Sequence, residues 1–394
     1  MAEIFNALPG SASYTYQSYW WRYVTARWGA QRSVHSYELV NEQDPWNAGG
    51  YVHTQDLAAW MHANDPTHHS AITSFWNSFP DTGFWKNPAY PDIDHADVHA
   101  YLFYGTPENT DTAYAHWVLG RDLASRGVGK PITRGETGIL GSGWSESTDL
   151  KLDTTGVWLH NLTWAQLDAD GMSEFYWYTA NIRGENVGHG NLYNVYRVFR
   201  SFMSDIPLGN GHYFDAAATS SNTSIRVVGQ YDPVNGRGHL WINRAEHTWR
   251  NVVDNVQIAP ITGTVTVPGL AGRAKYNIIR FDTYTGAVLD EQTAVTPATG
   301  LLSLTIQNLT TDIAIKIDLV MRLAACDFDQ DGDVDQSDFG HMQACLSGAG
   351  VPQNNATCQD AKLDPDSDVD SSDVAIFRRC LSGPDIPANP NCAN

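Results

Sequence analysis

The chain has 394 residues, 42% of them apolar, which is enough for two or three domains with packed cores. Its formal net charge of -20 disfavours nucleic acid and anionic membrane as partners. No run of 18 or more apolar residues occurs, so we expect no membrane span, and the first residues lack the layout of a signal peptide. The 14 Trp and 18 Tyr residues supply flat rings that stack on sugars or fill cores.

Residues 1–206 alternate β-rich runs with helical patterns, as a parallel α/β architecture requires. Strands are expected at 34–41, 69–75, 95–101, 131–135 and 173–178. Apolar residues at three-to-four spacing predict helices at about 15–29, 53–63, 111–126, 154–169 and 190–204. This region is therefore predicted to hold five strand–helix units.

The pattern changes to period-two alternation at residues 207–322, broken by Gly, Asn and Pro turns. Runs such as SIRVVGQYD and KYNIIRFDTYTG are typical of an all-β sandwich. We expect no catalytic cluster there.

The last segment, residues 323–394, is a separate acidic module. It holds 13 Asp, no Glu and three basic residues, and therefore half of the net charge. It also holds all five cysteines of the chain, at positions 326, 345, 358, 380 and 392. The stretch from Asp327 repeats from Leu363, which predicts two equivalent folding units.

Each copy of the repeat carries a loop with the ligand spacing of a calcium site. In the first, Gly332 allows the tight turn and the Asp333 carbonyl is the seventh-position ligand, while carboxylates stand at Asp327, Asp329, Asp331, Asp335 and Asp338. In the second, Lys362 replaces the first ligand and Ser367 the glycine, which leaves Asp364, Asp366, Asp370 and Asp373. We expect Ca²⁺ in both loops, more weakly in the second; the alternative is a solvated acidic tail.

This tail resembles a dockerin, a calcium-dependent module that binds a cohesin domain on a scaffoldin or cell surface. It differs in ending each helix with Cys-Leu-Ser-Gly, which suggests disulfides Cys345–Cys358 and Cys380–Cys392 and leaves Cys326 over, although spacing alone leaves the pairing open. Persistent disulfides would imply an extracellular or cell-surface location.

Two glutamates follow predicted strands in the first region. Glu42 ends YELVNE, and Glu136 lies in PITRGETG. In a parallel barrel the carboxyl ends of the strands form the active face, so the two carboxylates are expected to face each other. His99 and Tyr101 end a strand between them in DVHAY, and Trp177 follows the last one.

In this order the motifs resemble the retaining (β/α)8 TIM-barrel glycoside hydrolases that have the acid/base on strand 4 and the nucleophile on strand 7. The resemblance implies that Glu42 is the acid/base and Glu136 the nucleophile. It implies further that Asn41 binds the sugar 2-hydroxyl, Tyr101 bonds the nucleophile, His99 supports the site and Trp177 forms a sugar platform. The expected substrate is a β-linked plant or algal polysaccharide, and no cofactor is expected for catalysis.

The resemblance also implies that barrel strands 1 to 3 are missing, since strand 4 ends at residue 41. We therefore expect the chain by itself to be nearly inactive on aryl β-glycosides. Glu38, further from the strand end, is expected to make a structural hydrogen bond or ion pair. Several loop residues are candidates for lining the cleft or for packing: Trp46, Trp76, Trp144 and Asn181.

Two other functions are compatible with parts of the sequence. A non-catalytic, calcium-dependent glycan-binding or scaffold protein needs the tail and the aromatic residues but neither glutamate. A metal-dependent hydrolase lacks an HExxH motif, and the pair His68–His69 is better explained as structural.

Overall fold

The computed structural model describes residues 10–31, 33–44, 48–75, 79–167, 182–183 and 190–393, and the backbone of 172–176. It divides into two compact units. One comprises Met1–Ser204 and Glu246–Ile258, and the other comprises Asp205–Ala245 and Ala259–Asn394. Within the described ranges, every helix is too short or too polar to cross a bilayer.

Five short strands of the first unit occupy the five predicted segments: β1 (Ser36–Glu38), β2 (Ser70–Ile72), β3 (Ala96–His99), β4 (Ile132–Thr137) and β5 (Met172–Tyr176). All their pairings are parallel, as the alternation of strands and helices predicted. Among the described residues they form two sheets, β1-β2 and β3-β4-β5.

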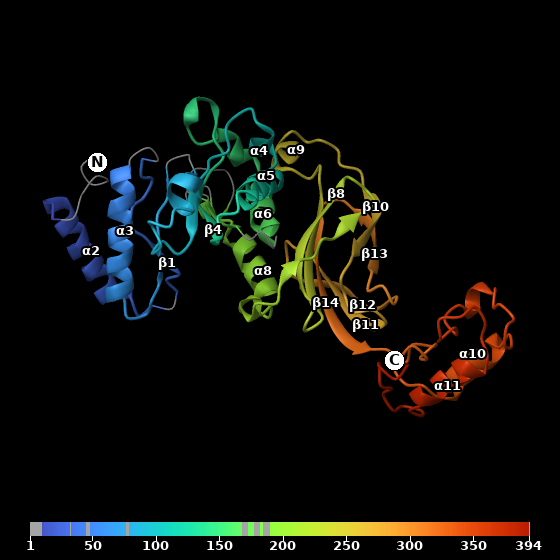
Figure 1. The fold of residues 1–394 in the computed structure, drawn as a ribbon. Helices are drawn as coiled ribbons and strands as arrows, with labels where there is room; N and C mark the ends of the chain where they lie inside the picture. The colour runs from blue at the N-terminus through green and yellow to red at the C-terminus, as the bar shows by residue number, and fades with distance from the viewer. Residues whose placement is uncertain are drawn as a thin grey trace. The chain divides into compact units, whose positions relative to one another are not determined.

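The helices of this unit are α2 (Ala12–Trp28), α3 (Ala48–Asn64), α4 (Pro107–Thr110), α5 (Thr112–Ser125), α6 (Val157–Trp164) and α8 (Tyr193–Met203). Figure 1 shows α2 and α3 beside β1 at one end of the unit. Side chains cap several of them; Asp111, for example, accepts from the Tyr114 amide at 3.1 Å at the start of α5. Helix α3 begins before its predicted start because Tyr51 is buried against Phe75 and Phe84, which offsets the low helix propensity of its first-turn glycines.

A segment distant in sequence completes the first unit. Helix α9 (Trp249–Val253) lies between two strands of the second unit in the chain. Its Trp249 indole donates to the Asn109 carbonyl at 2.8 Å, and Arg250 pairs with Asp149 at 2.7 Å. These contacts explain why 246–258 belongs to this unit although it follows β-rich sequence.

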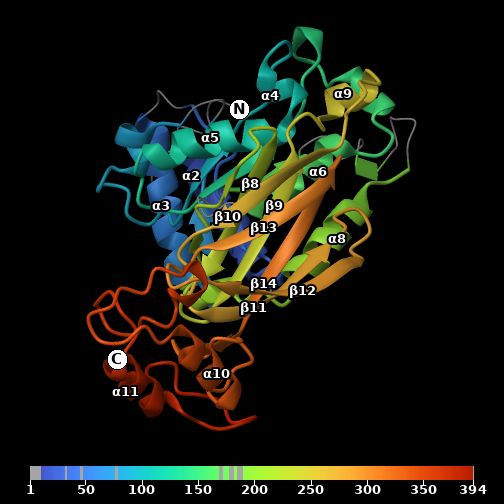
Figure 2. The same ribbon diagram turned by 90° about the vertical axis from the view of Figure 1, so that its right-hand side faces the viewer.

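The second unit contains two antiparallel sheets, ordered β12-β11-β14-β9-β8-β6 and β13-β10-β7 (Figures 1 and 2). Side chains from both sheets share one hydrophobic core, in which Ile242, Val265 and Leu304 are each at most 2% exposed. The strands are β6 (Phe214–Asp215), β7 (Thr219–Ser220), β8 (Ile225–Asp232), β9 (Arg237–Arg244), β10 (Ile261–Val267), β11 (Ala274–Phe281), β12 (Val288–Thr296), β13 (Leu302–Leu309) and β14 (Asp312–Arg322).

The acidic tail folds as two similar loop–helix halves with helices α10 (Gln336–Cys345) and α11 (Ser371–Cys380). The suggested disulfides Cys345–Cys358 and Cys380–Cys392 are both formed, and Cys326 is a buried free thiol. Each half also bonds the other reciprocally: the Val334 amide donates to Ser382 Oγ, and the Val369 amide to Ser347 Oγ, both at 3.0 Å. The repeated Cys-Leu-Ser-Gly motif thus joins the two halves.

Candidate active site

The two predicted carboxylates meet around one histidine. His99 lies opposite Glu136 in the register of β3 and β4, and Glu42 follows the carboxyl end of β1. His99 Nδ1 is 3.0 Å from Glu42 Oε1 and 3.4 Å from Glu136 Oε2. One oxygen of each glutamate and one His99 nitrogen all lie within 4.8 Å of one another. The structure therefore brings together two carboxyl groups that are 94 positions apart in the sequence.

His99 contacts carboxylates through both of its ring nitrogens. Its side chain is 1% exposed, and Nε2 lies 3.6 Å from Glu38 Oε1 and 3.7 Å from Asp97 Oδ2. One buried imidazole thus connects the Glu42–Glu136 pair at Nδ1 with a second pair, Glu38 and Asp97, at Nε2.

The backbone of Glu42 has a left-handed conformation, with φ of 47°, which is uncommon for a residue other than glycine. Ser74, which follows the end of β2, holds this turn. The Glu42 amide donates to Ser74 Oγ at 2.8 Å, and the Gln43 amide donates to the Ser74 carbonyl at 3.2 Å. The Ser74 hydroxyl in turn donates to the Glu38 carboxylate.

Tyr101 orients the other glutamate. Its hydroxyl donates to Glu136 Oε2 at 2.6 Å, the short distance typical of a phenol bonded to a carboxylate. Two contacts, from Tyr101 and His99, therefore converge on the same oxygen of Glu136.

Burial raises the pKa values of both carboxyls in this second pair. It raises the pKa of Glu38 to about 7 against the opposing effects of the Ser74 hydrogen bond and His99. Burial also raises the pKa of Asp97, although Thr133 Oγ1 and the Gly135 amide donate to its carboxylate at 2.6 Å and 2.8 Å. A Cβ atom on Gly135 would lie 2.3 Å from Asp97 Oδ2, so any side chain there would displace the Asp97 carboxylate.

The other predicted site residues are placed differently. Asn41 is exposed next to Glu42. Trp144 is 67% exposed and packs edge-on against Phe103. The remaining predictions, Trp46, Trp76, Trp177 and Asn181, lie outside the described residues.

Sequence reasoning missed Asp97 and Ser74 as parts of this site. Asp97 precedes His99 by two residues and so shares its face of the strand, a signal that the motif DVHAY contained. Ser74 carried no comparable signal, because a serine after a strand is common in turns. The prediction for Glu38 agrees with its contacts to Ser74 and His99.

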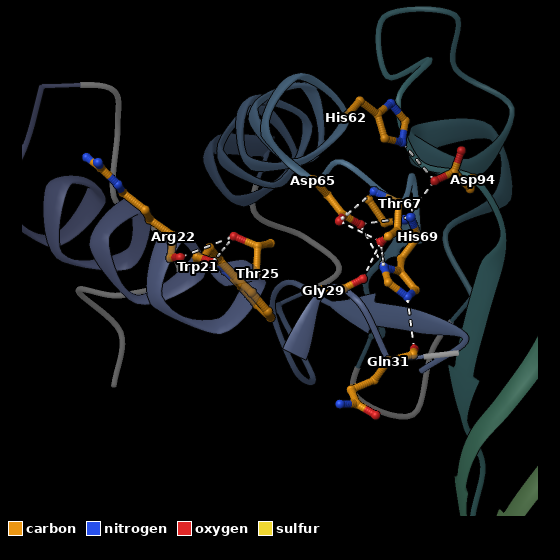
Figure 3. Close-up of polar contacts among 11 residues, drawn as sticks. Trp21, Arg22, Thr25, Gly29, Gln31, His62, Asp65, Thr67, His69 and Asp94 are labelled. Atoms are coloured by element: carbon orange, nitrogen blue, oxygen red, sulfur yellow. Dashed lines mark hydrogen bonds and ion pairs between the residues drawn. The ribbon is translucent and has the colours of Figure 1, made fainter. Parts of the chain in front are cut away.

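The His68–His69 pair has a structural role, because His69 contacts Asp65. His69 Nδ1 and the His69 amide lie 2.7 Å and 2.8 Å from Asp65 Oδ2, as Figure 3 shows. Thr67 Oγ1 approaches Asp65 Oδ1 at 2.9 Å and also donates to the Gly29 carbonyl (Figure 3). This network joins the ends of α2 and α3, in agreement with the structural explanation of the pair.

The acidic loops gather their carboxylates into compact groups. Oxygens within 4.8 Å of one another come from Asp327, Asp329 and Asp338, from Asp333, Asp335 and Asp338, and from Asp364, Asp366 and Asp373. The Asp333 side chain also accepts from the Asp385 amide at 2.5 Å, and the Lys362 ammonium donates to Gln359 at 2.9 Å.

No protein-family model matches the chain, and no curated protein matches its sequence. Similar solved structures include a glycoside hydrolase family 5 protein from Bacteroides vulgatus ATCC 8482, with 11% identity over 77% of this chain and 66% of that one and a TM-score of 0.48. A glucosidase from Croceicoccus marinus has 11% identity, coverage of 78% and 75%, and a TM-score of 0.42. A monomeric β-xylosidase from Caulobacter crescentus CB15 has 11% identity, coverage of 78% and 74%, and a TM-score of 0.43. These similarities, with TM-scores below 0.5, do not show that the chain belongs to a particular family.

Proposed function

We propose that the first unit is the catalytic part of a retaining glycoside hydrolase that cleaves β-linked polysaccharide. The observation that carries this proposal is the approach of Glu42 and Glu136, whose nearest oxygens lie within 4.8 Å. A retaining pair is separated by about 5 Å, whereas an inverting pair needs roughly 6.5–9.5 Å to admit a water molecule.

The chemistry follows a double displacement. A Glu136 carboxylate oxygen attacks the anomeric carbon while Glu42 gives its proton to the departing glycosidic oxygen, which leaves a glycosyl ester on Glu136. Glu42, now ionised, then takes a proton from water as the water attacks the same carbon and Glu136 departs. The Tyr101 and His99 contacts to Oε2 support attack through the other oxygen, Oε1.

The remaining site residues have supporting roles in this proposal. His99 fixes the spacing of the two carboxyls, because one ring nitrogen contacts both. Asn41, exposed beside the acid/base, binds the 2-hydroxyl of the sugar. Trp177 is proposed as the platform on which the sugar ring stacks.

Covalent labelling tests the proposal, since it detects even one slow turnover. The full chain is incubated with a panel of 2,4-dinitrophenyl 2-deoxy-2-fluoro-β-glycosides, and its peptides are analysed by mass spectrometry. We expect one sugar adduct, on the peptide that contains Glu136, and none in Glu136→Gln. Glu42→Gln is the matched control: it should still be labelled, because dinitrophenolate leaves without protonation. The proposal is contradicted if no glycoside of the panel labels the full chain or Glu42→Gln, or if the label lies on another residue. Glycan binding without labelling would favour a binding protein.

We propose further that the tail binds Ca²⁺ and docks onto a cohesin-type partner outside the cytoplasm. The donor set fits the ion: burial and the neighbouring Asp338 carboxylate raise the pKa of Asp327 to about 6, so the loop concentrates negative charge that a cation would neutralise. The loop from Asp327 to Asp338 would hold one ion. The second loop would bind another ion more weakly, through Asp364, Asp366, Asp370 and Asp373. Bound Ca²⁺ would fix the loops ahead of α10 and α11. The two disulfides support an oxidising location.

A further inference from the structure

The six-stranded sheet of the second unit carries a polar pocket of about 370 Å³. Seven of its ten lining residues have polar or charged side chains, among them Tyr213, Arg237, His239, Lys316 and Asp318. Its volume lies at the lower end of the range for small-molecule sites, which is about 300–1,000 Å³. The pocket is unrelated to the glutamate pair, since all of its residues belong to the second unit.

Strand register builds the floor of this pocket. His239 pairs with Lys316 and Arg237 pairs with Asp318 across β9 and β14. Alternation along each strand places all four side chains on the sheet face opposite the core residues Leu240 and Ile317.

The floor of the pocket contains a buried polar atom without a hydrogen-bond partner among the described residues, the Nε2 of His239. His239 is 1% exposed, and within the part of the chain that the structure describes its Nε2 makes no hydrogen bond. A buried polar atom without a partner is unfavourable, so a ligand group that bonds it would bind favourably. Burial and Lys316 also lower the pKa of His239 to about 4, so the ring is neutral at pH 7.

The charges of the pocket balance. Lys316 pairs with Asp205, and Arg237 Nε lies 3.4 Å from Asp318 Oδ1. A ligand of either sign would meet one repelling charge for each attracting one, which favours a neutral ligand. The pairs still offer adjacent donors and acceptors, since Arg237 has five N–H groups and its contact with Asp318 uses one.

We propose that this pocket binds one neutral sugar unit of a glycan, which makes the second unit a glycan-binding module. Neighbouring hydroxyls of a pyranose both donate and accept, and so match Arg237, Asp318 and His239 Nε2. Tyr213, whose ring centroid lies 5.5 Å from that of His239, supplies the aromatic wall for the apolar face of the sugar.

The test follows ring-nitrogen signals of ¹⁵N-histidine-labelled full chain by NMR, with the His239 signals assigned through His239→Gln. The probes are methyl β-glycosides of glucose, xylose, mannose and galactose, with glucuronate and inorganic phosphate as anionic comparisons. We expect a neutral glycoside to shift the His239 signals in the original chain and equally in Glu136→Gln. Arg237→Ala and Tyr213→Ala should weaken the response at least fivefold, while Arg322→Ala, at the exposed end of β14, should not.

Two results would overturn the proposal. One is that no neutral glycoside shifts the His239 signals, and the other is that an anion alone does so. Neither depends on the chemistry of Glu42 and Glu136, so failure here is distinguishable from failure of the proposed hydrolase.

Discussion

Ser74 Oγ accepts a hydrogen bond from the Glu42 amide at 2.8 Å while its own proton goes to the Glu38 carboxylate. The Ser74 hydroxyl therefore connects the left-handed backbone of Glu42, the proposed acid/base, with the carboxylate of Glu38. Together with the His99 contacts, this closes a ring of four residues that consists of Glu42, Ser74, Glu38 and His99.

Removal of that hydroxyl should slow the reaction without weakening ligand binding. In Ser74→Ala the Glu42 amide loses its partner, and we expect the rate constant for hydrolysis of the 2-fluoroglycosyl adduct, the step in which Glu42 acts as the base, to fall about tenfold, or ~1.4 kcal/mol. The inhibitor concentration for half-maximal rate of labelling should stay within about twofold. Ser125→Ala on the exposed end of α5 is the control. An unchanged rate constant would show that Ser74 does not position Glu42.

Glu38 should make the stability of the chain depend on pH. Because burial raises its folded pKa from 4.5 to about 7, the group stabilises the fold below pH 4.5, and this contribution is lost as the pH rises through 7. Glu38→Gln removes the titration. Urea unfolding should therefore show that wild type loses about 2 kcal/mol relative to Glu38→Gln between pH 5 and pH 8. Equal pH slopes for both proteins would contradict this.

A methyl group at residue 135 should disrupt the Glu38–Asp97 pair. Gly135→Ala would force Asp97 away from the Gly135 amide and from His99, and we expect a loss of about 2 kcal/mol in the free energy of unfolding. Gly120→Ala is the matched control, because a Cβ there meets nothing within 4 Å and the residue lies inside α5. It should be neutral or stabilising by about 0.5 kcal/mol. Equal effects of the two changes would refute the steric explanation.

Asp65 should stabilise the first unit only as a carboxylate. Its burial favours the neutral acid, but hydrogen bonds from His69 and Thr67 outweigh this and lower its pKa. Its contribution is therefore present above pH 3.8 and lost as the pH falls through the lower folded value. We expect Asp65→Asn to cost about 1–3 kcal/mol at pH 7, with the difference from wild type shrinking below about pH 4. The exposed Asp122→Asn on α5 should cost at most about 0.5 kcal/mol; a cost for Asp65→Asn that is independent of pH would contradict the ionic role.

Calcium should distinguish the two halves of the tail. Calorimetric titration of the calcium-stripped full chain should show a greater loss of affinity in Asp331→Ala than in Asp366→Ala, because Lys362 has already replaced one ligand of the second loop. Stripping with a chelator should also lower the unfolding temperature of the tail. Equal losses in the two variants would contradict the ranking.

The sequence alone determined the features that depend on local patterns. Hydrophobic period predicted the five parallel strands of the first unit, and loop spacing predicted the acidic groups of Asp327 and Asp364. The positions of Glu42 and Glu136 after predicted strands indicated the site, because parallel strands present their carboxyl ends at one edge. The repeat also suggested the two disulfides, although spacing alone left their pairing open.

Only the tertiary structure decided the contacts between distant residues. Ser74 bonds a residue 32 positions away, and Trp249 a carbonyl 140 positions away. Four carboxylates meet at His99 because β1, β3 and β4 bring them there, and the His239 pocket exists because β9 and β14 pair in one register. Hydrophobic period and loop chemistry do not encode the strand register or the packing of α9 in the first unit. The register and this packing depend on which surfaces pack once the elements have formed.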